Sequence, residues 1–132
     1  MPTPSALPDL PLARLMGLRI LSVSPEKVTA ELPVTPALCT IPAILHGGAV
    51  MAFADTLGAV ATVANLPAGF STTTIESKTN FFAAIPVGET AQADCTPLHR
   101  GKTTMVWQTR ISRADGKLAA IVTQTQLVLA PR

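Results

Sequence analysis

Apolar and polar residues alternate along most of the second half of the chain. In the clearest stretch, between residues 103 and 113, Met105, Trp107 and Ile111 fall on one face of an extended chain. This period of two is typical of β-strands with one buried face. The same pattern predicts four strands, over residues 70–83, 88–98, 103–113 and 118–129. An Asp-Gly pair at residues 115–116 favours a hairpin between the last two of them.

The first part of the chain predicts shorter elements. Residues 9–16 fit a short helix that Asp9 caps and Gly17 ends. Two strands are expected at 18–24 and 28–34, and Pro33 indicates an edge strand or the end of a strand. The segment from 35 to 45 contains two prolines and no regular period, which predicts a loop.

The longest apolar stretch covers residues 47–65 and predicts a helix that is covered on most sides. A membrane span is the alternative, but the stretch is rich in Ala and Gly and carries Asp55 near its middle, which favours burial inside a protein. Two strands, one long helix and four strands form an α+β domain, in which an antiparallel sheet of five to six strands wraps around the helix. No linker divides the chain, so we assign residues 1–132 to one domain.

Composition changes this picture in one respect. Apolar residues make up 48% of the 132 residues and charged residues only 14%, which is little polar cover for a small monomer and favours an oligomer. The net charge of +2 gives no sign of nucleic-acid binding. Cys39 and Cys95 lie far apart, outside the spacing of a C-x-x-C or zinc motif. One disulfide between them is the alternative, but a core of this size does not need it, so we expect reduced thiols in the cytoplasm. The N-terminal 17 residues have no basic residue before Arg14, and we expect no signal peptide there.

Asp55 is the only formally charged residue between Leu32 and Ile75. An ionised carboxylate among Ala, Phe, Met and Leu costs free energy unless it is paired or hydrogen-bonded. Such a residue is a candidate catalytic carboxylate, acting as a base or a nucleophile. The alternative is a structural aspartate that hydrogen-bonds a loop or a helix end.

His46, Gly47 and Gly48 stand where the long helix is expected to begin. Two glycines there would leave bare N–H groups at the positive end of the helix dipole, as in an oxyanion hole, and would let a ligand approach the backbone. Alternatively, the glycines allow tight packing against a strand. A lone histidine is a weak signal, and with no second histidine nearby we predict no metal site.

The spacing of these features has a consequence for assembly. Asp55 lies eight residues beyond Gly47, which is about 12 Å along a helix. Gly47 and Asp55 of one chain are therefore too far apart to contact the same reacting carbon. If both act on one bond, they come from two chains whose helices lie antiparallel about a two-fold axis.

Three segments of the sequence resemble the hotdog-fold acyl-CoA thioesterases, in the phenylacetate-degradation (PaaI) and 4-hydroxybenzoyl-CoA branch. They are LHGGAVMAFAD at 45–55, TIESKTNFFAAIPVG at 74–88 and HRGKT at 99–103. The resemblance covers residues 15–130 and implies the hotdog fold. It also implies that Asp55 is the catalytic acid, that the N–H of Gly47 polarises the thioester carbonyl and that His46 shapes the site. Thr74 aligns with a Ser or Thr that assists the water or the carboxylate.

The resemblance further implies a substrate-binding role for three basic residues. His99, Arg100 and Lys102, which we expect in a tight turn with Gly101, fall where basic residues meet coenzyme A phosphates. The alternative for them is an ordinary solvated turn. Gly48 would let the substrate approach the backbone.

Two positions depart from the family pattern. Thr40 stands where an Asn or Gln often orients the water or the carboxylate, and Ala43 stands where a small residue such as Gly is usual. These changes bear on the rate and on water positioning more than on the fold.

The expected function is hydrolysis of acyl-CoA thioesters, with coenzyme A as part of the substrate and no cofactor. The expected assembly is at least a homodimer, and the resemblance implies a homotetramer. The main alternative is a non-catalytic acyl-CoA binder or sensor, which Thr40 supports. A hotdog dehydratase and a Cys39–His46 thiol hydrolase fit the motifs less well.

Overall fold

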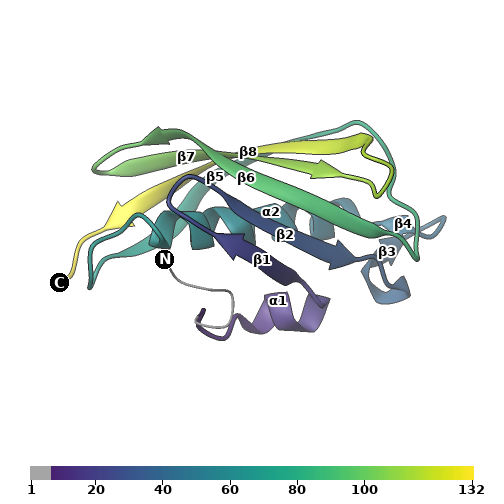
Figure 1. Ribbon diagram of the computed structural model, residues 1–132, viewed down its shortest axis with the longest axis horizontal. Helices are drawn as coiled ribbons and strands as arrows, with labels where there is room; N and C mark the ends of the chain where they lie inside the picture. Colours follow the sequence, from purple (N-terminus) through teal and green to yellow (C-terminus); the bar gives the residue numbers. More distant parts are fainter. Residues whose placement is uncertain (1–6) are drawn as a thin grey trace.

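The computed structural model describes residues 7–132; the first six residues of the predicted domain, where no signal peptide was expected, lie outside this part. A curved six-stranded sheet covers one long helix (Figure 1). The elements are α1 (Pro11–Met16), β1 (Arg19–Val23), β2 (Val28–Pro33), a 3-10 turn (Pro36–Leu38), β3 (Cys39–Thr40), β4 (Ile44–Leu45), α2 (Gly47–Val63), β5 (Ser71–Phe81), β6 (Thr90–Arg100), β7 (Thr104–Ser112) and β8 (Leu118–Leu129).

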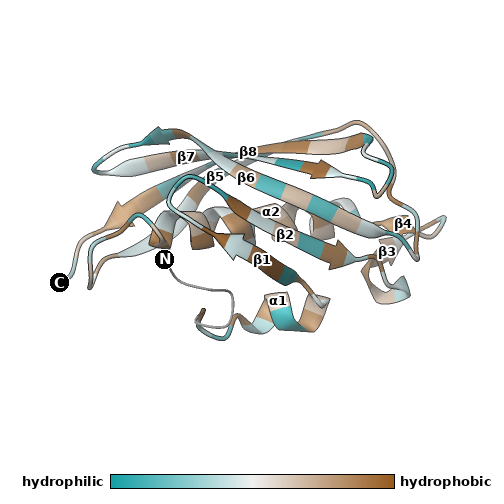
Figure 2. Ribbon diagram, viewed as in Figure 1, coloured by the Kyte–Doolittle hydropathy of each residue, from teal (hydrophilic) through white to brown (hydrophobic). Residues whose placement is uncertain are grey.

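The strands follow the order β1-β2-β6-β7-β8-β5, and every neighbouring pair is antiparallel. This arrangement confirms the predicted α+β class, with six strands around one helix. Apolar and polar residues alternate along β6 in Figure 2, and the buried positions alternate with exposed ones in its first half. β5 is an edge strand, and most of its residues are exposed.

α2 packs against the concave face of the sheet through fully buried side chains. Phe53 and Leu57 point into a core that also contains Trp107 of β7. The indole Nε1 of Trp107 donates a hydrogen bond to the Thr62 hydroxyl at 2.8 Å. Within residues 7–132, no helix combines the length and the hydropathy that a membrane span requires.

The helix ends differ slightly from the predicted ones. α1 begins at Pro11 rather than at residue 9, because Asp9 forms an ion pair with Arg14 (2.7 Å) and does not cap the helix. Gly17 ends α1 with a φ of 79°, as predicted. α2 ends at Val63 rather than at residue 65.

Two further predictions are wrong in detail. His99 and Arg100 are the last residues of β6, not turn residues, and the reversal begins at Gly101. The predicted loop at 35–45 contains β3 and β4, which pair with each other. Ala43 lies between them with a φ of 64°, a conformation that favours glycine. Pro33 marks the end of β2, which is an inner strand.

Candidate active site

Asp55 lies in the middle of α2 and is half-buried. The Thr74 hydroxyl on β5 donates a hydrogen bond to Asp55 Oδ1 at 2.6 Å. The register between β5 and β8 shifts just after Thr74, and such bulges commonly re-aim a side chain. No other hydrogen bond or ion pair engages the carboxylate within residues 7–132. Its second oxygen, Oδ2, is therefore free to react, and the partner is neither a loop nor a helix end.

His46 caps the N-terminus of α2. Its Nδ1 accepts a hydrogen bond from the backbone N–H of Gly48 at 2.7 Å. Nδ1 therefore carries no proton, and the neutral ring holds its proton on Nε2. The cap occupies the Gly48 donor, whereas the N–H of Gly47 has no acceptor in the described part of the chain. Of the two glycines, Gly47 is thus the one that can polarise a carbonyl.

Gly47 also packs closely against β5. A Cβ at this position would lie 3.2 Å from the tip of the Phe81 ring. The packing reading of the glycine pair is therefore correct for Gly47, and it is compatible with a free N–H. The role of the Gly47 N–H as a donor to a substrate carbonyl stays a prediction.

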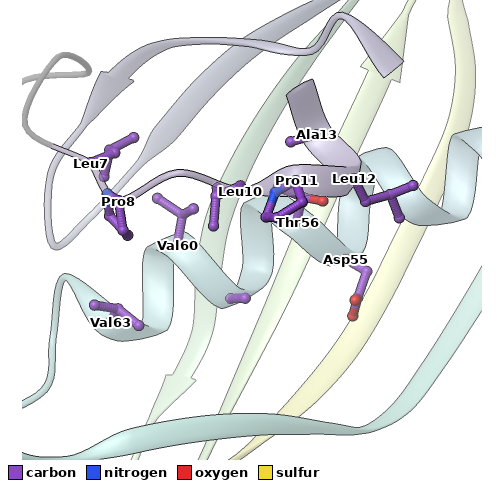
Figure 3. A pocket seen from close by; sticks show the side chains of 11 residues that line it. Leu7, Pro8, Leu10, Pro11, Leu12, Ala13, Asp55, Thr56, Val60 and Val63 are labelled. Carbon is purple, nitrogen blue, oxygen red and sulfur yellow. The ribbon is translucent and has the colours of Figure 1, made fainter. Parts of the chain in front are cut away.

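An apolar cavity of about 320 Å³ opens beside Asp55, between α2 and the N-terminal segment (Figure 3). Asp55 lies towards one end of the row of α2 side chains and Val63 at the other. The hydroxyl of Thr56 is occupied by the carbonyl of Ala52 at 2.8 Å. Asp55 is the one charged residue among those that line this cavity, and its carboxylate points away from the N-terminal segment in Figure 3. The lining residues are Leu7, Pro8, Leu10, Pro11, Leu12, Ala13, Asp55, Thr56, Ala59, Val60 and Val63.

Gly47 lines a different cavity, of about 350 Å³, together with Thr40, Phe81 and Phe82. Thr40, His46 and Gly47 therefore gather at the start of α2, whereas Asp55 and Thr74 meet near its middle. A single chain does not bring the two halves of the predicted site into one cavity.

The three basic residues predicted to bind phosphates, His99, Arg100 and Lys102, do not have similar surroundings. Arg100 Nη1 donates hydrogen bonds to the carbonyl of Pro25 (3.2 Å) and to Oδ1 of Asn65 (3.4 Å), and it lies 3.9 Å from the carboxylate of Glu26. This side chain connects the β1–β2 turn to the end of α2. Lys102 is exposed and forms no ion pair within residues 7–132. His99 packs beside Gly101, where an added Cβ would lie 2.5 Å from its Nε2.

The two cysteines form no catalytic pair with histidine. Cys39 Sγ donates to the carbonyl of Thr35, and His46 Nδ1 is used by the cap. Burial raises the pKa of the Cys95 thiol to about 11. In the part of the chain that the structure describes, no three potential metal-ligating side chains cluster.

Sequence analysis missed two glutamines behind the site. Gln124 and Gln126 of β8 are fully buried, and Gln126 Nε2 donates a hydrogen bond to Thr74 Oγ1 at 2.6 Å. A signal was present in the sequence. In the Thr-Gln-Thr-Gln run at 123–126, both amides share the strand face of the apolar Val122.

The sequence and the fold are both similar to those of known proteins. Residues 43–120 match the Thioesterase superfamily model. PA1618 of Pseudomonas aeruginosa, which is named an esterase, is 30% identical over 116 residues, or 87% of this chain and 79% of the relative. The crystal structure of thioesterase HI1161 from Haemophilus influenzae has a TM-score of 0.85 at 25% identity, covering 90% of this chain and 82% of that one.

A second similar structure shows the fold alone. It is smu.793 from Streptococcus mutans bound to acetyl CoA, with a TM-score of 0.80 at 22% identity, over 87% of this chain and 90% of that one. The family match and these structures together confirm the resemblance to the hotdog-fold thioesterases.

Proposed function

The chain belongs to the thioesterase superfamily, and from this premise we propose that it hydrolyses acyl-CoA thioesters to a free acid and coenzyme A. One observation carries the proposal. Asp55 lines an apolar cavity, with Oδ1 held by Thr74 at 2.6 Å and with Oδ2 free. A carboxylate that is fixed on one side and free on the other is suited to act on a bound carbonyl or on water.

The thioester carbonyl would accept a hydrogen bond from the N–H of Gly47 in a partner subunit. In one route, Asp55 Oδ2 takes a proton from water while the water oxygen attacks the carbonyl carbon. In the other, Oδ2 itself attacks and forms a mixed anhydride, which water then hydrolyses. In both routes the C–S bond breaks, and the coenzyme A thiolate leaves and takes up a proton. Thr74 holds Oδ1, the carboxylate oxygen that does not react, while His46 keeps Gly47 in place by capping the helix.

The substrate would divide between two environments. The cavity beside Asp55 has an apolar wall that suits an apolar acyl group better than the amide-bearing pantetheine arm. His99, Arg100 and Lys102 would meet the phosphates, from whichever subunit presents them at the mouth of the site. The acetyl CoA bound to smu.793 supports coenzyme A as the carrier, because that protein shares the fold. Coenzyme A enters as substrate, and the proposed chemistry needs no cofactor.

The proposed active unit is a homodimer, and two such dimers would form a tetramer. The separate cavities of Gly47 and Asp55 support a site that two subunits complete. A large apolar surface on and beside the edge strand β5 is available for the contact, since Ile75, Phe81 and Phe82 are each more than half exposed. The free state of both cysteines fits a reducing compartment, so we place the protein in the cytoplasm.

A non-catalytic acyl-CoA binder is the second candidate. Thr40 favours it, because a single hydroxyl replaces the amide that would orient water. This hydroxyl lies in the cavity of Gly47, so it can still contact a ligand there.

Asp55→Asn separates the two candidates. A thiol-release assay over aromatic, short and long acyl-CoAs should find turnover in the unchanged protein and a loss of about 10²- to 10⁴-fold in the variant. The melting temperature should be held or raised, since a buried charge is removed. Asp94→Asn, on the exposed face of β6, is the matched control. A variant that keeps more than about a third of kcat, far short of that loss, would rule out Asp55 as the catalytic group. Binding without turnover in the unchanged protein would favour the binder.

A further inference from the structure

We propose that Gln124 and Gln126, named below the glutamine pair, are positioning residues that fix the direction of the hydrogen bond between Thr74 and Asp55. The inference rests on the proposed catalytic role of Asp55. The pair is fully buried on β8, between α2 and β5, and neither side chain touches solvent. It would act on the reaction only through the Thr74 hydroxyl.

The orientation of the pair is set by a backbone carbonyl of α2. Gln124 Nε2 donates a hydrogen bond to the carbonyl oxygen of Ala54 at 2.7 Å. A carbonyl can only accept, so the nitrogen of this amide must face the helix and its oxygen must face away. That oxygen, Oε1, lies 2.6 Å from Gln126 Nε2 and accepts a hydrogen bond from it.

The second amide passes this orientation on to Thr74. Gln126 Nε2 has two hydrogens, of which one goes to Gln124 and the other to Thr74 Oγ1 at 2.6 Å. Its own Oε1 lies 2.9 Å from the Thr72 hydroxyl, which has the carbonyl of Leu127 as a second acceptor at the same distance. Turning the Gln126 amide over would place its oxygen against Gln124 Oε1, which can only accept. The amide is therefore locked.

Thr74 then has one arrangement left. Its oxygen accepts from Gln126, so its single hydrogen is free to point at Asp55 Oδ1, 2.6 Å away. The chain of hydrogen bonds starts at Ala54 and ends at Asp55, which are adjacent residues of the same helix. An ionised carboxylate can only accept, so a hydroxyl committed to donation suits it. Oδ1 stays occupied, and Oδ2 is the oxygen that faces the substrate.

α2 makes room for this arrangement at one residue. Gly58 lies one turn beyond Ala54, and a Cβ there would come within 2.5 Å of all three atoms of the Gln124 amide group. The amide therefore fills the space that a side chain would take. Glycine is less favourable than alanine inside a helix, so its use here needs a compensating contact.

A double-mutant cycle tests the proposal. Gln126→Met keeps the length of the side chain and removes the amide, and Thr74→Val removes the hydroxyl that links the pair to Asp55. We expect Gln126→Met to lower kcat by about tenfold to a hundredfold, the cost of a misplaced catalytic group, with KM changed less than about twofold. In the Thr74→Val background the same change should alter kcat by less than about twofold, because the link is already broken. Gln108→Met, on the outer face of β7, is the control and should leave kcat unchanged.

The outcomes separate the proposal from its premise. Equal losses of kcat from Gln126→Met in both backgrounds, or no loss in either, would overturn the positioning role. If Gln126→Met does not fold, Gln124→Met provides the same cycle from the other end of the pair. Side-chain amide resonances of the glutamine pair offer a readout that needs no activity. They should shift in Thr74→Val and stay in Gln108→Met, and unmoved resonances in Thr74→Val would overturn the hydrogen-bond chain. Retained activity in Asp55→Asn would instead overturn the proposed function.

Discussion

Gly58 and Gln124 fill the same space from opposite sides: a Cβ on Gly58 would lie 2.2 Å from the amide nitrogen of Gln124. Turning a side chain of α2 cannot relieve this clash, because the position of a Cβ atom is fixed by the backbone. The amide is also held, since it is fully buried and bonded to Ala54. Gly58 and Gln124 are therefore coupled through packing, and Gln124 also takes part in the hydrogen bonds behind Asp55.

Gly58→Ala should destabilise the protein. The helix gains about 1 kcal/mol from the better propensity of alanine, but overpacking a well-filled core costs about 1 to 3 kcal/mol and the lost amide contacts add to that. The cost of the clash should exceed the gain in helix propensity, so urea unfolding should show a lower free energy of unfolding. Gly58→Ala combined with Gln124→Ala should recover part of the loss, because the space is vacated. A combined variant less stable than Gly58→Ala alone would contradict the coupling.

Much of the fold could be predicted because its signals are local. The alternation along β7 and the Gly-Gly start of α2 depend on neighbours in sequence, and both elements lie close to their predicted ranges. β6 extends through Arg100, however, because His99 and Arg100 pair with Val106 and Met105 of β7 after a shift in register. The β3–β4 pair has only two residues per strand, too few for a period to be recognised.

The site could be predicted only as far as its residues are unusual in the sequence. Asp55 stands out as a lone charge, and its contact with Thr74 agrees with the role that the resemblance implied for Thr74. The glutamine pair gives a weaker signal, namely that both residues share the strand face of Val122, and this signal does not say what the amides contact. Only the three-dimensional arrangement turns β8 into an inner strand and places both amides behind Thr74.

Cys95 should make the protein less stable at alkaline pH. Burial raises the pKa of its thiol from 9.0 to about 11. Above pH 9 the unfolded chain loses this proton while the folded chain keeps it, so the free energy of unfolding falls as pH rises. The fall should be about 1 kcal/mol per pH unit and should end near pH 11.

Urea unfolding at pH values between 9.0 and about 11 measures this fall in the free energy of unfolding. The chain contains no tyrosine, so phenol groups do not contribute to this range. Cys95→Ala should flatten the pH dependence even though it lowers stability at neutral pH by leaving a small cavity. If the slope is unchanged in Cys95→Ala, the loss of stability at alkaline pH comes from other groups.

Cys39, which is half-exposed, should react with a thiol reagent in the folded protein, and Cys95 should not.

Replacing Lys102 should affect substrate binding alone, whereas replacing Arg100 should also lower the stability of the protein. Lys102→Ala should raise KM for acyl-CoA more than it lowers kcat, and it should weaken the salt dependence of KM. Its melting temperature should stay unchanged, because the side chain is exposed. Arg100→Ala should raise KM and also lower stability by about 1 kcal/mol, since the guanidinium bonds to Pro25 and Asn65. Unchanged KM and salt dependence in the double variant would support an ordinary solvated turn.

Gly47→Pro should abolish hydrolysis while leaving the fold intact. Proline lacks the N–H that would polarise the thioester carbonyl, and it is well tolerated at the first position of a helix. His46 has φ −62° and ψ 138°, the extended conformation that a residue before proline prefers. The ring would approach Phe81, which is more than half exposed and can move. We expect a melting temperature close to that of the unchanged protein and a loss of about 10²- to 10³-fold in kcat. Gly47→Ala, which keeps the N–H, is the control for the added bulk.

Mixing Gly47→Pro with Asp55→Asn decides whether the site spans two subunits. In a mixed dimer, one site would combine both changes and the other would combine an unchanged Gly47 with an unchanged Asp55. Co-refolding equal amounts should make about half of the dimers mixed, so about a quarter of all sites should be intact and activity should return to that level. If both groups act within one chain, every chain carries a defect and no activity returns. Sedimentation at the assay concentration provides the necessary check, because a fully active monomer of the unchanged protein would also exclude a shared site.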